Sequence, residues 1–148
     1  MKTLKISTIF LMIFMLGCGL TTLAQEKKDN MTETKIDKAD KLTVVWTSGD
    51  REVAIKMVFM YTYNAKKYGW WKDITLLVWG PSSKLLSEDK ELQDYVKKMK
   101  EEGVNIMACK ACADMYGVAD KLTELGVTVK YAGVDLTNFI KEGHVVTF

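Results

Sequence analysis

Short apolar runs alternate with helix-like segments along most of this chain, and this alternation constrains its fold more than any other feature. Runs at 42–46, 73–79, 104–108, 127–131 and 144–148 have the length and composition of strands. Strands that are apolar throughout and separated by helices pair in parallel, because both faces of the sheet are covered. The sequence therefore predicts an α/β fold, a three-layer α/β/α sandwich with a mostly parallel sheet of about five strands.

The segments between these runs have the apolar spacing of amphipathic helices. Helices are predicted over 52–67, 87–102 and 136–142. A further single helix is predicted through Met115, Val118, Ala119 and Leu122, and Gly126 closes it. Glycines near the ends of three of these segments support the boundaries.

The first 24 residues are typical of an export signal rather than of the fold. Lys2 and Lys5 precede an apolar run at 6–16 that is too short to span a bilayer comfortably. Small residues before Gln25 favour cleavage after Ala24, which predicts a periplasmic protein; the alternative is a lipoprotein anchored through Cys18. Residues 25–40 are polar and predict a flexible tether, so the folded domain is expected at 41–148.

Charge excludes two classes of partner. The two signal lysines account for the formal net charge of +2, so no basic field remains after cleavage. We therefore expect no nucleic-acid binding and no attraction to an anionic membrane surface. Because the apolar run at 6–16 is removed with the signal, we also expect no stable membrane span in the mature form.

Cys109 and Cys112 form a CxxC motif where an apolar strand gives way to a helix. The backbone N–H groups and the dipole at the start of a helix favour thiolate over thiol, which points to sulfur chemistry. The alternative is that two small side chains simply pack the corner. One CxxC and His144 are one ligand short of a tetrahedral zinc site, so we expect neither a metal nor a cofactor.

Other candidate residues follow the first two strands, at the edge where ligands gather in parallel sheets. Glycine and hydroxyl side chains there are able to hold an anion, although helix capping and turn formation are the favoured interpretation. The predicted ligand-binding rim consists of Ser48, Gly49, Asp50, Pro81 and Ser82, beside Cys109.

The segment 107–118 resembles the DsrE/DsrF-like family of small α/β sulfur-relay proteins. Cys109 and the pair Gly117-Val118 match the family's cysteine and the glycine and aliphatic residue that follow it in the next helix. The resemblance implies a flavodoxin/Rossmann-like layering over 41–148 and a persulfide on Cys109. It also implies a homotrimer or homohexamer with the cysteine near a subunit interface, and a protein that donates or accepts the sulfur.

Together these observations predict an exported, periplasmic sulfur-handling protein. Its two candidate roles are sulfurtransferase and sulfur carrier. Cys109 would carry a persulfide for transfer or storage, and Cys112 would modulate or resolve it. Cys109 is expected to be the more exposed and faster-alkylated thiol.

The alternatives are a non-catalytic oligomeric binding or assembly subunit with structural cysteines, and a dithiol-disulfide oxidoreductase. The oxidoreductase is disfavoured because Pro81, the single proline, precedes the cysteines, whereas thioredoxins place a cis-proline after theirs.

Overall fold

Five parallel strands form one sheet in the computed structural model, which describes residues 40–148. The predicted signal and nearly all of the predicted tether lie outside the described residues. Each of the four strand pairs is parallel, so the predicted α/β fold and strand number are confirmed. The sheet order is β4-β3-β2-β1-β5, with bounds β1 Lys41–Trp46, β2 Asp73–Val78, β3 Asn105–Cys109, β4 Thr128–Lys130 and β5 His144–Thr147.

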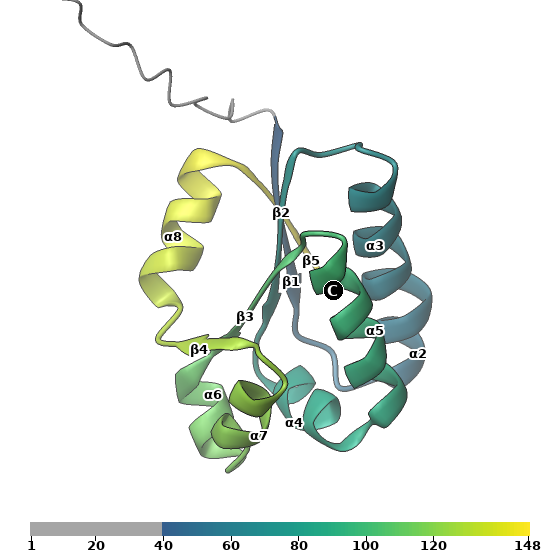
Figure 1. Cartoon of the computed structure of the whole chain (residues 1–148). Coiled ribbons are helices and arrows are strands. Elements are labelled where there is room, and N and C mark those ends of the chain that lie inside the picture. Colours follow the sequence, from purple (N-terminus) through teal and green to yellow (C-terminus); the bar gives the residue numbers. More distant parts are fainter. Residues whose placement is uncertain (1–39) are drawn as a thin grey trace, which may run out of the picture. The chain divides into compact units, whose positions relative to one another are not determined.

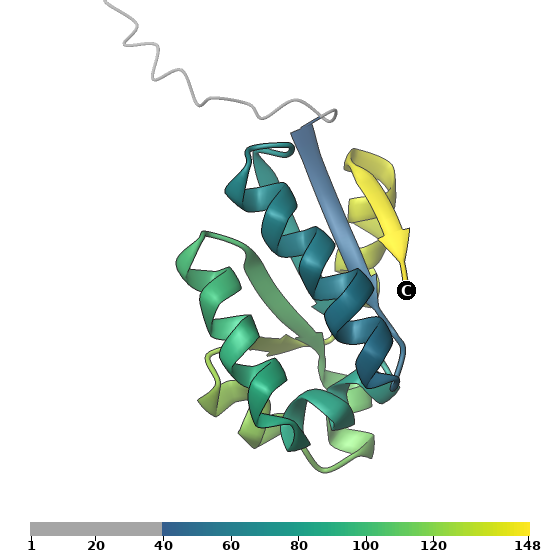
Figure 2. The same ribbon diagram turned by 90° about the vertical axis from the view of Figure 1, so that its right-hand side faces the viewer.

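The described helices are divided unequally between the two faces of this sheet. Helices α2 to α7 contribute buried or packed side chains to one face, and α8 lies across the other (Figure 1; Figure 2). The first group consists of α2 Arg51–Val53, the π-helix η2 Ala54–Phe59, α3 Met60–Lys67, α4 Pro81–Glu88, α5 Lys90–Glu101, α6 Lys110–Met115 and α7 Ala119–Glu124; α8 is Gly133–Glu142.

The strand order explains this unequal division. From β1 to β4 each new strand is added on the same side of the previous one. Right-handed crossovers in one direction place all their helices on one face of the sheet. The connection from β4 to β5 runs back in the opposite direction, and its helix α8 therefore lies on the other face.

The predicted helix 87–102 corresponds to α5, which begins at Lys90. Its start is later than predicted because a separate helix, α4, which the periodicity did not reveal, ends at Glu88. Helix α4 begins at Pro81, where Gly80 has φ 73°, and it ends before Asp89. Asp89 is extended and caps α5, since its Oδ1 accepts a hydrogen bond of 3.1 Å from the N–H of Leu92. A proline at the first helical position was the sequence signal for α4.

The predicted single helix through Met115 and Leu122 is wrong. The chain forms α6 and α7, separated at Gly117, whose φ of 65° is incompatible with a continuing helix. Met115 is consequently 86% exposed, whereas Val118 and Leu122 are buried as expected. None of the helices in residues 40–148 is long and apolar enough to cross a bilayer.

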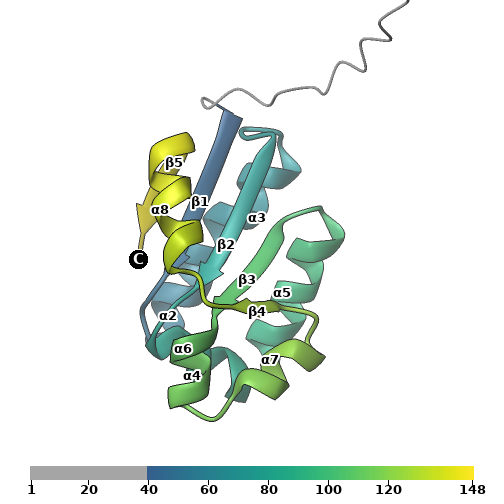
Figure 3. The ribbon, with the colours of Figure 1, turned by 90° about the vertical axis from the view of Figure 1, so that its left-hand side faces the viewer.

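The two faces differ in packing as well as in helix number. On the face covered by α2 to α7, Trp46 and Phe59 are fully buried in an edge-to-face contact with centroids 4.9 Å apart. The opposite face, crossed by α8 in Figure 3, has a much smaller buried cluster. It consists of Val45, Leu77, Met107, Cys109 and Ala132.

Candidate functional site

The two cysteines lie together at the carboxyl end of β3. Cys109 is the last residue of β3 and the N-cap of α6, with φ −70° and ψ 112°, and Cys112 is the third residue of that helix. Side chains at an N-cap and at the third helical position lie on the same side of the first turn. Both cysteines are free thiols in the structure.

Cys109 is the more buried of the two, so the prediction that it is the more exposed thiol is wrong. Its residue is 4% exposed, whereas Cys112 is half-buried. The reason is strand alternation: Met107 and Cys109 point to the same face of β3, and that face carries the small apolar cluster beneath α8. Faster alkylation of Cys109 was expected from its greater exposure, and the observed exposures favour Cys112 instead.

The surroundings of Cys112 keep it protonated at neutral pH. Burial raises the pKa of this thiol above its ordinary value of 9.0, and the backbone N–H of Gly80 opposes that shift by hydrogen bonding to the sulfur. The Cys109 side chain raises the pKa further, through a hydrogen bond and through its charge. Cys112 also packs against the small cluster that contains Cys109, and Gly80 lies in the segment that follows β2.

The charged residues beside the thiols are paired with each other. Lys110 Nζ lies 2.7 and 2.6 Å from the two carboxylate oxygens of Asp114, and 5.7 Å from the centroid of the Tyr131 ring. The hydrogen bond with Asp114 raises the pKa of Lys110. The lysine thus stays charged, but its charge is balanced within its own helix.

Three residues of the predicted rim form hydrogen bonds that cap a helix or link the ends of β1 and β2. Asp50 caps α2 by accepting hydrogen bonds of 2.7 and 3.0 Å from two N–H groups of that helix, and Ser48 Oγ accepts one of 3.0 Å from Asp50. The buried Ser82 Oγ donates to the carbonyl of Trp46 at 2.6 Å and accepts from the N–H of Trp79 at 3.1 Å. These contacts support the capping interpretation, and ligand binding by the rim stays a prediction.

The other two rim residues, Gly49 and Pro81, come together at a shallow pocket. A Cβ on Gly49 would lie 3.2 Å from Pro81 Cβ, so the two segments are in close contact. The pocket has a volume of about 280 Å³, and neither cysteine lines it. Its lining consists of Gly49, Pro81, Lys84, Leu85, Glu88 and Tyr116.

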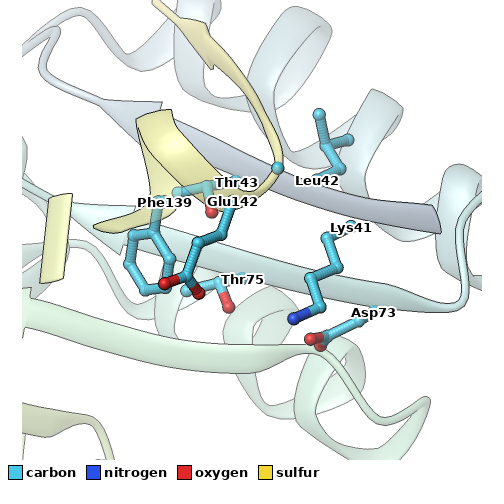
Figure 4. Close-up of a pocket in the computed structure, with 8 residues that line it drawn as sticks. Lys41, Leu42, Thr43, Asp73, Thr75, Phe139 and Glu142 are labelled. Atoms are coloured by element: carbon cyan, nitrogen blue, oxygen red, sulfur yellow. The ribbon is translucent and has the colours of Figure 1, made fainter. Parts of the chain in front are cut away.

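A second pocket, missed by the sequence analysis, lies at the opposite end of the strands beneath α8. It has a volume of about 90 Å³, and its floor includes Thr43 and Thr75, which are partners in the β1–β2 register (Figure 4). Both threonines are buried. Figure 4 shows the Lys41 ammonium directed toward the Asp73 carboxylate at its edge. Polar residues in otherwise apolar strands were the signal for this pocket.

Residues of the types that bind metals are dispersed in the described part of the chain. Within residues 40–148, no three His, Cys, Asp or Glu side chains gather closely enough to hold a metal ion. His144 begins β5 at the edge of the sheet, where its ring lies 5.2 Å from that of Trp71.

Comparisons with known proteins agree on the fold. The model of the DsrE/DsrF-like family matches residues 40–148. BT1422 from Bacteroides thetaiotaomicron, a protein of unknown function, is 38% identical with a TM-score of 0.71, and the match covers 74% of this chain and 95% of that one. The ychN protein from E. coli is 15% identical with a TM-score of 0.58, and the match covers 74% and 99%; this likeness supports the fold alone. No curated protein matches the chain.

Proposed function

We propose, from the premise that this chain belongs to the DsrE/DsrF-like family, that it is an exported sulfur-handling protein in which Cys109 holds sulfane sulfur as a persulfide. The observation that carries the proposal is the pair of interacting free thiols at the carboxyl end of β3. In this fold class, chemistry is concentrated outside the carboxyl ends of the strands.

The chemistry requires no metal or organic cofactor. The Cys109 thiolate attacks the sulfane sulfur of a donor, and the donor's own sulfur leaves with the bonding electrons. An acceptor thiolate later attacks the outer sulfur of the persulfide and releases the Cys109 thiolate. Packing against Val45, Leu77 and Met107 shields the stored sulfur from oxidants in bulk solvent. Transfer and storage use the same persulfide on Cys109. They differ in whether an acceptor protein removes the sulfur.

Structural cysteines are the second candidate, and the burial of Cys109 is the observation that favours it. A free cysteine in an apolar cluster packs as a small hydrophobic side chain. Under this alternative the protein is an oligomeric binding or assembly subunit. The double variant Cys109→Ser, Cys112→Ser would then keep both its oligomeric state and its partner.

Loading with inorganic polysulfide tests the carrier proposal. Trypsin cleaves after Lys100, Lys110 and Lys121, so Cys109 and Cys112 fall in separate peptides, 101–110 and 111–121. After alkylation, mass spectrometry should find one added sulfur on the 101–110 peptide of the parent, and also of the matched control Cys112→Ser. If Cys109→Ser takes up as much sulfane sulfur as the parent, Cys109 is not the carrier.

The assembly proposed with this function is a homotrimer or homohexamer in which a neighbouring subunit covers the α8 face. None of the residues of α8 is buried, and Val134 and Ile140 are 73% and 59% exposed. A helix with apolar residues on its outward as well as its inward side is normally covered. Because the thiols lie on the same face of the sheet as α8, the neighbour would lie beside them.

Export is part of the proposal and is supported by the sequence of residues 1–24. The intact mass of protein recovered from the periplasm should correspond to a chain that begins at Gln25. A lipid-modified protein whose modification disappears in Cys18→Ser would establish the lipoprotein alternative instead. Cytoplasmic protein with an uncleaved N-terminus would contradict both.

A further inference from the structure

We infer that Cys112 discharges the persulfide on Cys109 as hydrogen sulfide and closes a disulfide between the two cysteines. The inference rests on the proposed function and adds a second activity to the same site, the reductive release of stored sulfur. It assigns Cys112 the role of attacking thiol. It also predicts two products, sulfide and an oxidised protein.

The contact between the two side chains determines which sulfur is attacked. Cys112 packs against the small buried cluster that contains Cys109, and the two residues occupy the N-cap and the third position of the first turn of α6. In a persulfide the stored sulfur is attached beyond Sγ, so the atom that faces Cys112 is the inner sulfur, Cys109 Sγ. Attack on the inner sulfur expels the outer one, whereas attack on the outer sulfur would only move it from one cysteine to the other.

The step is balanced without a further reactant. A bond forms between Cys112 Sγ and Cys109 Sγ, and the bond between Cys109 Sγ and the outer sulfur breaks. The bonding electrons leave with the outer sulfur as hydrosulfide, which takes a proton to form hydrogen sulfide. The sulfane sulfur is reduced by two electrons, and the two cysteine sulfurs are oxidised to the disulfide. An external dithiol must then reduce that disulfide by thiol exchange before another sulfur is loaded.

Cys112 attacks in its deprotonated form. Only the thiolate attacks, and burial with the neighbouring Cys109 holds the Cys112 pKa above 9.0. Two ion pairs lie nearby: Lys110 with Asp114 on α6, and Lys130 with Asp135 at the start of α8. The Tyr131 ring faces Lys110, and Asp120 acts on that lysine through its charge. A raised Cys112 pKa therefore slows the attack at neutral pH.

The test follows sulfide and disulfide together. The full chain and its Cys112→Ser variant are loaded with inorganic polysulfide, freed of excess donor by gel filtration, and incubated without reductant. Sulfide is trapped with a bimane, and tryptic peptides are mapped under non-reducing conditions. The parent should release one sulfide for each persulfide lost and join peptides 101–110 and 111–121. Cys112→Ser should release sulfide at least about tenfold more slowly, because it lacks the intramolecular thiol.

The results of this test distinguish failure of the discharge step from failure of the carrier function on which it depends. Equal sulfide release from the parent and from Cys112→Ser overturns the discharge step while leaving the carrier function intact. Joined peptides without released sulfide show direct oxidation of the dithiol and also overturn the step. Failure of Cys112→Ser to load any sulfur on Cys109 overturns the carrier function and the inference together.

Discussion

The two faces of the sheet differ in how much of their surface the chain itself covers. On one face, the helices from α2 to α7 bury an extended apolar core around Trp46, Phe59 and Leu76. On the other, α8 has no buried residue and covers a cluster of five, one of which is Cys109. The first face has the packing that stabilises a domain, and the second has the thiol proposed to carry sulfur, beneath a helix without buried residues.

Under the proposed function, stability and sulfur chemistry are separated across the sheet. Neighbouring residues of one strand can therefore have different roles, because alternate side chains point to opposite faces. Leu76 and Leu77 of β2 provide a matched pair, since both are fully buried and each faces a different layer.

The largest expected effect is at Leu76. Leu76→Ala should lower the free energy of unfolding by about 4 kcal/mol, because the surrounding helices cannot close the cavity, and Leu77→Ala by about 2 kcal/mol, because α8 is free to move inward. Urea denaturation of the two variants at the same low protein concentration measures the difference. An equal or greater loss for Leu77→Ala would show that the α8 face is as tightly packed as the other.

An intermediate effect is expected on assembly. Ile140→Glu places a charge on the exposed side of α8 and should shift the proposed trimer or hexamer toward monomer, because an unpaired charge is not tolerated in an apolar interface. Met60→Glu is the matched control, since Met60 is similarly exposed, at 50%, on the opposite layer. Light scattering at micromolar concentration measures both. A monomeric parent, or dissociation by Met60→Glu alone, would rule out the α8 face as the interface.

The smallest expected effect concerns Asp89, which joins two helices of the well-packed face. The N–H of Leu92 and the guanidinium of Arg51, 2.8 Å away, lower the pKa of Asp89 below 3.8. Its carboxylate therefore stabilises the fold above that value, and the contribution is lost as the pH falls through the lowered pKa. Asp89→Ala should cost about 1 kcal/mol at pH 7.

The pH dependence of this difference separates the cap from simple packing. The parent and Asp89→Ala should converge in stability as the pH is lowered below 3.8. Asp89→Asn keeps an oxygen that accepts from Leu92 and should lose less than Asp89→Ala. A constant difference from neutral to acidic pH in urea denaturation would contradict a role for the charge.

The fold could be predicted because its signals are local. Apolar runs of strand length and the glycines between them were sufficient for five strands in a parallel sheet. Helix boundaries were less accurate wherever one residue interrupts a continuing pattern. Gly117 separates α6 from α7 although the apolar spacing continues across it, whereas Asp89 ends α4, a helix that the periodicity did not reveal, and caps α5.

The site could be predicted only in part, because its chemistry depends on contacts between distant segments. The sequence indicated that Cys109 and Cys112 share a strand-helix junction, and the structure places them there. It did not indicate which face of β3 Cys109 occupies, nor that the N–H of Gly80 reaches Cys112. Both depend on the strand register and on the side of the sheet where α8 lies.

The most direct test of Cys109 as a sulfur carrier is the sulfur state of that residue in the Cys112→Ser variant, isolated from the periplasm without reductant. Removing Cys112 prevents discharge, so a sulfur acquired in the cell stays where it was bound. Tryptic mapping should find the 101–110 peptide with one added sulfur. An unmodified thiol on that peptide, which also takes up none after exposure to polysulfide, would contradict the account.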